Sequence, residues 1–338
     1  MKRVTFLIGN GFDINIGLKT QYSDFYKYYI QHSTNHKLSK EIQADIKRWA
    51  DLEYELGKYT AKIRFDEMNS FLVEEDHLEQ ILADYLENEC KKIKIDTPQK
   101  KEKIAIQMQD YLMNFYKGLN NEQKKHIKKY FSMKRESIEY SFINFNYTDT
   151  LEKILKITED VVTPDIGVHE AELGGIYSHS IGKHIHIHGT TSEEMVLGVN
   201  DESQIANKQL CKSSYFKELL IKPESNRRYG QNKIETAKAI IDESMIICIF
   251  GMSIGKTDKM WWEYICKWLS GNRDRRLIIF VKKKDTFRKT KKNVFSGENT
   301  ILEKMMDNVT EIGETWNVIR NQIYIEFNTE IFKFGNMV

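Results

Sequence analysis

The amino-acid sequence predicts an α/β fold in which a mostly parallel sheet carries helices on both faces. Short apolar runs typical of buried strands recur along the chain, at residues 4–8, 141–145, 245–250, 277–281 and 323–327. Segments with helical periodicity separate most of these runs, and strands joined through helices pair in parallel. A long helical region after the first run predicts an all-helical insertion in a Rossmann-like core.

The composition describes an ordinary globular chain without a preference for nucleic acid or membranes as partners. The 338 residues are 41% hydrophobic, and 51 basic against 49 acidic residues leave a net charge of +2. The apolar run that follows Met1 is too short for a signal peptide or a membrane span. The four cysteines form no C-x-x-C pair. We therefore expect a cytoplasmic protein with reduced thiols, no membrane partner and no structural zinc.

The first strand, Val4–Ile8, ends at Gly9, and a second glycine follows at Gly11. In doubly wound folds such a turn brings a phosphate-bearing ligand to backbone N–H groups at a helix start. The next glycine is Gly17, so the spacing departs from G-x-G-x-x-G. Two interpretations stay open, a phosphate-binding turn and a tight turn without a ligand.

Residues 21–135 lack a convincing strand and show apolar residues spaced by three and four. The clearest stripes are Ile42, Ile46, Trp49, Leu52, Leu56 and Tyr59; Leu78, Ile81, Leu82, Tyr85 and Leu86; and Ile104, Met108, Leu112 and Phe115. We predict that this region is a helical insertion, and that residues 1–20 and 136–338 form the Rossmann-like core. Further helices are predicted near 203–221 and 232–242.

Four loops leave predicted strands at glycine, asparagine or histidine. They are Gly9–Asp13, Asn146–Asp149, His188-Gly189 and Gly251–Gly255. Ligands of open parallel sheets bind beyond the carboxyl ends of the strands. We therefore expect these loops to converge on one site.

The motifs in these loops resemble those of the bacteriophage abortive infection AbiH family. They are G-N-G-F-D (9–13) with G-L-K-T (17–20), F-N-Y-T-D-T-L-E (145–152), H-I-H-G-T (186–190) and F-G-M-S-I-G-K-T-D (250–258). Their order and spacing match over the length of the chain, although the family pattern has a histidine where this chain has Met252. The resemblance implies an antiphage effector. Such an effector would be switched on by a phage-derived trigger and kept inactive as a homo-oligomer before that.

The same loops are similar to those of sirtuin-related NAD-consuming enzymes. Gly9-Asn10-Gly11 takes the place of their G-A-G loop, and His188 that of the histidine in their H-G pair. The resemblance implies an enzyme with a sirtuin-like fold that hydrolyses NAD to ADP-ribose and nicotinamide. The zinc cysteines of sirtuins are missing, which argues against deacylation. The carboxylate that follows the catalytic asparagine is shifted by one residue, with Thr148 in its place and Asp149 next.

From this resemblance and the chemistry of the side chains, three residues are predicted to be catalytic. Asn146 would hold water or a ribose hydroxyl, His188 would act as a base, and Asp149 or Asp13 would hold a ribose hydroxyl or orient the histidine. NAD would be the substrate, and no metal is expected. The predicted NAD-binding residues are Gly9, Asn10, Gly11, Phe12, Asp13, Thr20, Tyr147, Gly189, Gly251 and Ser253.

Other functions remain open at this point. His184, His186 and His188 alternate, so on a strand they would share one face and could ligate a metal, as in a nuclease. Ser253 lies in G-x-S-x-G, the pattern of a hydrolase nucleophile, but no histidine follows it in the chain. Asn146 could simply cap a helix. The chain could also bind a nucleotide as a sensor without turnover.

Overall fold

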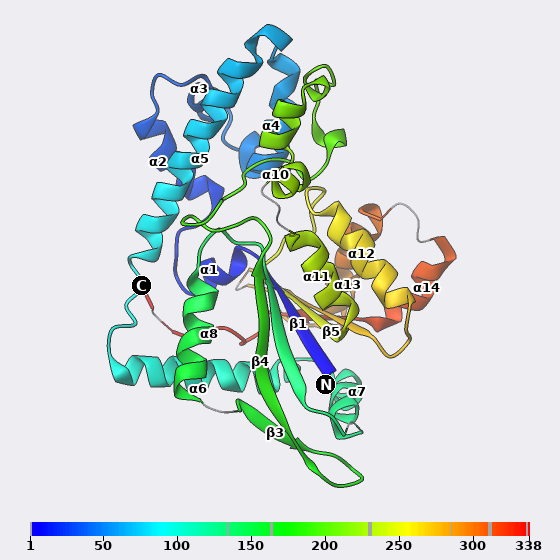
Figure 1. Cartoon of the computed structure of the whole chain (residues 1–338). Coiled ribbons are helices and arrows are strands. Elements are labelled where there is room, and N and C mark those ends of the chain that lie inside the picture. The colour runs from blue at the N-terminus through cyan, green and yellow to red at the C-terminus, as the bar shows by residue number, and fades with distance from the viewer. Residues whose placement is uncertain are drawn as a thin grey trace.

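Within the described residues, a seven-stranded sheet runs through the molecule (Figure 1). The computed structural model describes residues 2–133, 135–162, 165–228, 232–284, 286–309, 313–335 and 337–338. The strands are β1 (Lys2–Ile8), β2 (Ile138–Asn144), β3 (Gly167–Glu170), β4 (Ile176–His186), β5 (Ser244–Phe250), β6 (Arg276–Val281) and β7 (Ile323–Phe327). Their order in the sheet is β3-β4-β2-β1-β5-β6-β7.

The strand order confirms the Rossmann-like prediction. All neighbours pair in parallel except β3, which forms an antiparallel hairpin with β4. The chain adds β2 and β4 on one side of β1, and then crosses to β5, β6 and β7 on the other side. The order therefore reverses between β1 and β5, and ligands of doubly wound sheets bind at such a reversal.

Two strand predictions needed revision. β3 was not predicted, because its four residues are too few for a clear period-two pattern and it forms the sheet edge. β4 ends at His186, so His188 lies in the loop after the strand. Only His184 and His186 belong to the strand, so the three histidine side chains do not share one face of the sheet.

Alternating residues of the central strands bury opposite faces of the sheet. Phe6 of β1 belongs to an apolar core with residues 104–131 and 151–155. Its neighbour Leu7 belongs to a second core, on the other face, with residues 237–241 and 261–269. The prediction of helices on both faces is thus confirmed by the side chains that these helices contribute.

The helices have the following bounds: α1 (Gly11–Asn15), α2 (Tyr22–His32), α3 (Lys37–Ala44), α4 (Leu52–Tyr59), α5 (Met68–Cys90), α6 (Pro98–Asn114), α7 (Asn121–Ser132), α8 (Thr150–Val161), α9 (Ser214–Leu220), α10 (Lys222–Arg228), α11 (Lys233–Asp242), α12 (Lys259–Ser270), α13 (Lys291–Asp307) and α14 (Trp316–Ile319). The helix predicted near 232–242 corresponds to α11. The one predicted near 203–221 is instead a loop with two 3-10 turns and the short α9. No helix in the described part of the chain is both long and apolar enough to cross a membrane.

The helical region predicted as one insertion divides between two cores. α2 to α5 pack into a third apolar core together with residues 197–221, and they lie beyond one end of the sheet (Figure 1). α6 and α7 instead pack on the face of the sheet that contains Phe6. The periodicity of α6 reveals an apolar stripe but not its partner, so the sequence could not assign this helix to the sheet.

Candidate active site

A pocket of about 1280 Å³ lies at the carboxyl ends of β1, β2 and β5. It brings together ten of the residues predicted for the site: Gly9, Asn10, Gly11, Asp13, Thr20, Asn146, Tyr147, His188, Gly251 and Ser253. Helices α2 and α4, from the helical region, provide further lining residues such as Tyr22, Tyr26 and Glu53. The four loops therefore meet where the strand order reverses, and the helical region supplies another wall.

The glycines at the strand ends hold two turns against each other. The N–H of Gly9 donates to the Phe250 carbonyl at 2.9 Å, and that of Gly11 donates to the Gly251 carbonyl at 2.8 Å. A Cβ atom on Gly11 would lie 2.4 Å from the Cα of Gly251, so the contact requires glycine. These two amides are engaged within the protein, and they are not donors for a pyrophosphate. The glycines instead allow the β1 and β5 loops to approach.

Three residues that line the pocket each have a buried polar atom without a hydrogen-bond partner in the described part of the chain. These atoms are Oδ1 of Asp13, Nδ2 of Asn146 and Nδ1 of His188. The three residues are 1%, 6% and 5% exposed. Most buried polar atoms in folded proteins are paired, and leaving one unpaired costs about 1–3 kcal/mol. We call these three residues the pocket floor.

Asp13 supplies the carboxyl group of the pocket floor. Its Oδ2 accepts a hydrogen bond of 2.6 Å from the hydroxyl of Thr148. Burial, with a smaller contribution from the charge of Glu152, raises the pKa of Asp13 to about 7 against the lowering effect of the Thr148 hydrogen bond. Thr148 is the residue that replaces the expected carboxylate after Asn146, so the Asp13 carboxyl group is held next to this loop by a distant part of the chain.

His188 is neutral near pH 7. Burial lowers its pKa well below the usual 6.5, and the nearby charges of Lys222 and Lys233 lower it further. The ring packs at centroid distances of 5.9 Å from Phe145 and 6.3 Å from Tyr147. A neutral imidazole has a ring nitrogen that can accept a proton or a hydrogen bond.

Three residues predicted for the site lie outside the pocket lining. Asp149 is the N-cap residue of α8, and its half-exposed side chain lies 2.7 Å from the Lys153 ammonium. Phe12 is buried against Phe250 and Phe332. Gly189 adopts a φ of +73° in the turn after His188, where a Cβ atom would lie 2.1 Å from a carbonyl oxygen. Their geometry indicates structural roles, and the Asp149 carboxylate does not face the pocket.

The remaining predicted residues take identifiable positions. Asn10 and Thr20 pair with each other, since the Asn10 amide donates to the Thr20 carbonyl at 2.8 Å and the Thr20 hydroxyl donates to the Asn10 side chain. Ser253 is exposed, and the next helix begins only at Lys259, so the sharp strand-to-helix turn of a nucleophile elbow does not form.

The row of histidines separates in space. His184 is exposed, His186 lies 2.9 Å from Glu152, and His188 faces the pocket. Among the described residues, no three His, Cys, Asp or Glu side chains gather as metal ligands would. Asn146 does not cap α8, because Asp149 occupies that position.

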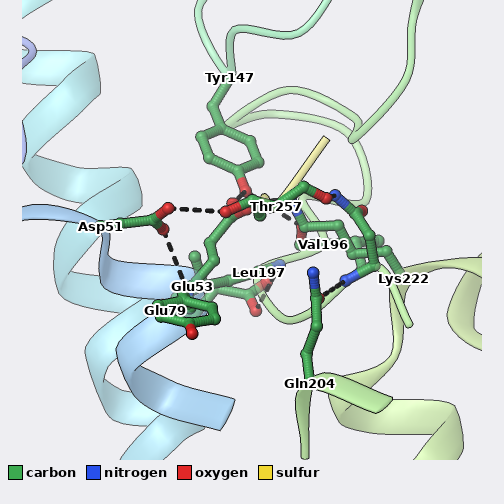
Figure 2. Close-up of polar contacts among 11 residues, drawn as sticks. Asp51, Glu53, Glu79, Tyr147, Val196, Leu197, Gln204, Lys222 and Thr257 are labelled. Atoms are coloured by element: carbon green, nitrogen blue, oxygen red, sulfur yellow. Dashed lines mark hydrogen bonds and ion pairs between the residues drawn. The ribbon is translucent and has the colours of Figure 1, made fainter. Parts of the chain in front are cut away.

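A second polar group, which sequence analysis missed, joins the helical region to the core (Figure 2). Lys222 is 2% exposed, and its ammonium lies 2.6 Å from Oε1 of Glu53. The same oxygen accepts a 2.8 Å hydrogen bond from the Tyr147 hydroxyl. Nearby, the Thr257 hydroxyl donates to Asp51 at 2.6 Å. We call these five residues the junction cluster. They come from four distant segments, so no local pattern could have revealed the cluster, although the loop motif had already singled out Tyr147.

A family of known proteins matches most of the chain. The family model described as "Bacteriophage abortive infection AbiH" matches residues 5–282, a range that contains all four loops of the pocket. No curated protein matches the chain.

Proposed function

The chain belongs to the bacteriophage abortive infection AbiH family, and on this premise we propose that it acts against phage by hydrolysing NAD to ADP-ribose and nicotinamide. The observation that carries the proposal is the pocket floor, where an acceptor of Asp13, a donor of Asn146 and Nδ1 of His188 are buried without partners among the described residues. A ligand rich in hydroxyl groups, such as the nicotinamide ribose, offers both donors and acceptors to them.

The size and position of the pocket suit a dinucleotide. Its volume of about 1280 Å³ exceeds the roughly 300–1,000 Å³ typical of sites for drug-sized ligands. It lies where the strand order reverses between β1 and β5, as dinucleotide sites do in doubly wound sheets.

The chemistry requires little more than these groups. The bond between the ribose and the pyridinium nitrogen breaks, and its electron pair neutralises the nicotinamide, which leaves without being protonated. Water adds to the ribose carbon, and its proton passes to a base and then to solvent. The transition state resembles an oxocarbenium ion, as in glycoside hydrolysis. We assign the base to His188, the positioning of the water or a ribose hydroxyl to Asn146, and the holding of a ribose hydroxyl to Asp13.

Incubating the purified protein with NAD and following nicotinamide release tests the proposal. Asn146→Ala and His188→Ala are each expected to lower turnover by about 10²-fold or more, because each removes a group that acts on the reacting atoms. Asn88→Ala and His184→Ala, at exposed positions, are the matched controls and are expected to retain turnover.

Inert wild-type protein, with and without components of phage-infected cells, would overturn the hydrolase proposal. If ADP-ribose then raised the melting temperature without any product, the pocket would belong to a nucleotide-binding protein. Degradation of RNA that a chelator abolishes would indicate a nuclease instead.

A further inference from the structure

The loop that carries Asn146 into the pocket is held from behind by three polar side chains. The N–H of Asn146 donates to Oδ1 of Asn144 at 3.0 Å, and the carbonyl of Asn146 lies 3.0 Å from Nδ1 of His186. The other ring nitrogen of His186 lies 2.9 Å from Oε1 of Glu152. The Asn144 amide donates to both Glu152 oxygens, at 3.2 and 3.3 Å.

The two polar neighbours of the His186 ring favour its charged form. Nδ1 lies 3.0 Å from the Asn146 carbonyl, and Nε2 lies 2.9 Å from the Glu152 carboxylate in an ion-pair contact that lacks hydrogen-bond geometry. Both neighbours are acceptors, whereas a neutral imidazole has only one N–H, so the arrangement favours the imidazolium. Burial disfavours this charge, but the Glu152 carboxylate and the Asn146 carbonyl outweigh burial and raise the pKa of His186 above 6.5.

The charges around His186 come from several elements. Glu152 and Asp149 belong to the start of α8, and both favour the imidazolium. The imidazolium charge also reaches two residues of the pocket floor. It lowers the pKa of Asp13 in α1, and it lowers the pKa of His188. The proton on His186 therefore favours the ionised form of Asp13 and the neutral form of His188.

His186 does not itself line the pocket, whereas Phe145, Asn146, Tyr147 and Thr148 of the held loop all do. The contacts of His186 with a bound ligand are therefore indirect: they pass through this loop, and its charge acts through Asp13 and His188.

We propose that His186 is a positioning residue, which as an imidazolium bridges Glu152 and the Asn146 carbonyl and so fixes the Asn146 amide in the pocket. The inference deepens the proposed function, because it names what orients a residue of the predicted reaction. When His186 loses a proton at alkaline pH, the carboxylate of Glu152 retains the N–H that faces it. The Asn146 carbonyl then loses its donor, and the loop is released.

Two amide substitutions separate the two polar contacts of His186. The nitrogen of asparagine takes the place of Nδ1 and can still donate to the Asn146 carbonyl, whereas that of glutamine takes the place of Nε2 and can reach only Glu152. We expect His186→Gln to lower kcat for NAD by about 10- to 100-fold with little change in KM, because a misplaced catalytic group acts on the transition state. His186→Asn should retain the larger share of kcat. Equal losses in both variants would overturn the proposal.

Glu152→Gln changes the pH dependence in a defined direction. The glutamine nitrogen donates to Nε2 of a neutral His186, whose remaining hydrogen on Nδ1 still bonds the Asn146 carbonyl, and its oxygen still accepts from Asn144. The alkaline decline in kcat that we expect for the wild type should therefore vanish in this variant. A merely structural role for Glu152 would lower the melting temperature and leave the pH profile unchanged, which would contradict the proposal.

A measurement without turnover distinguishes failure of this inference from failure of the proposed function. In protein labelled with ¹⁵N-histidine, the ring signals that disappear in His186→Gln belong to His186. Both nitrogens should still be protonated when the pH has risen past 6.5, the ordinary pKa of histidine. A neutral His186 ring below that pH would overturn the inference, whatever the protein does to NAD. A doubly protonated ring in a protein that is inert toward NAD would support the positioning role of His186 and overturn only the proposal that the protein hydrolyses NAD.

Discussion

The pocket floor and the junction cluster are both buried polar groups at the same edge of the sheet, but they differ in pairing. In the junction cluster, Lys222 and Tyr147 share an oxygen of Glu53, and Thr257 donates to Asp51. In the pocket floor, Asp13, Asn146 and His188 each leave a buried atom that no other described residue pairs with.

This difference separates polar groups that the protein satisfies itself from groups that are left for a ligand, although all five residues of the junction cluster also line the pocket. Pairing within the protein offsets the cost of burying polar groups, so the junction cluster can fix the helical region on the core. Unpaired buried atoms lower stability, and they become useful only when a ligand satisfies them. Burial alone does not distinguish these two cases, because Lys222 and Asp13 are almost equally inaccessible.

The largest expected effect on stability is at the junction cluster. Lys222→Met should lower the free energy of unfolding by about 3–5 kcal/mol, because it leaves the Glu53 side chain, which is only 12% exposed, without its cation. Urea denaturation measures the loss, and Lys212→Met, at an exposed position, is the control. The double variant Glu53→Gln/Lys222→Met should recover part of the loss. A loss below about 1 kcal/mol would mean that this ion pair contributes no more to stability than an exposed surface ion pair does.

Asp13→Asn should remove a pH dependence of stability. The folded protein retains the Asp13 proton up to about pH 7, whereas an unfolded aspartate loses it near 3.8. Rising pH between these values therefore favours unfolding, by up to about 1.4 kcal/mol per pH unit. Relative to this variant, the wild type should lose stability as the pH rises from 3.8 to about 7. Asp160→Asn, at an exposed position, should preserve the slope. A wild-type slope equal to that of Asp13→Asn would indicate an Asp13 that ionises normally.

Two asparagines in one segment provide a matched pair. Asn144 is fully buried, and both ends of its amide are paired, so Asn144→Ala should cost about 2–3 kcal/mol. Asn146→Ala removes a donor without a partner and should cost less than about 1 kcal/mol, while it abolishes turnover. Thermal unfolding and nicotinamide release measure the two effects. The comparison breaks down if both variants lose equal stability.

The smallest effect is expected at Asp149. Its carboxylate is half exposed and pairs with Lys153 rather than facing the pocket. Asp149→Asn should therefore change nicotinamide release by less than about twofold, since exposed ion pairs contribute little. A loss comparable to that of Asn146→Ala would restore Asp149 to the catalytic residues that the sequence suggested.

Local patterns in the sequence predicted β1, β2, β5, β6, β7 and most of the helices. The alternation that buries Phe6 and Leu7 on opposite faces is a property of a single strand, and the stripe of α6 is a property of a single helix. The glycines that end β1 and β5 were also visible, because a chain reversal needs particular residues. These signals depend on neighbours in the chain, so they can be recognised without the fold.

What the sequence by itself determined is therefore the Rossmann-like class, the helical region and the loops that meet at the carboxyl edge. Only the tertiary structure decided that Asp13 rather than Asp149 faces the pocket, that His186 and His188 point to different partners, and that Lys222 pairs with Glu53. The Asp13–Thr148 and Lys222–Glu53 contacts join residues 135 and 169 positions apart. Such pairing depends on where whole elements pack, and no local periodicity of the chain encodes it.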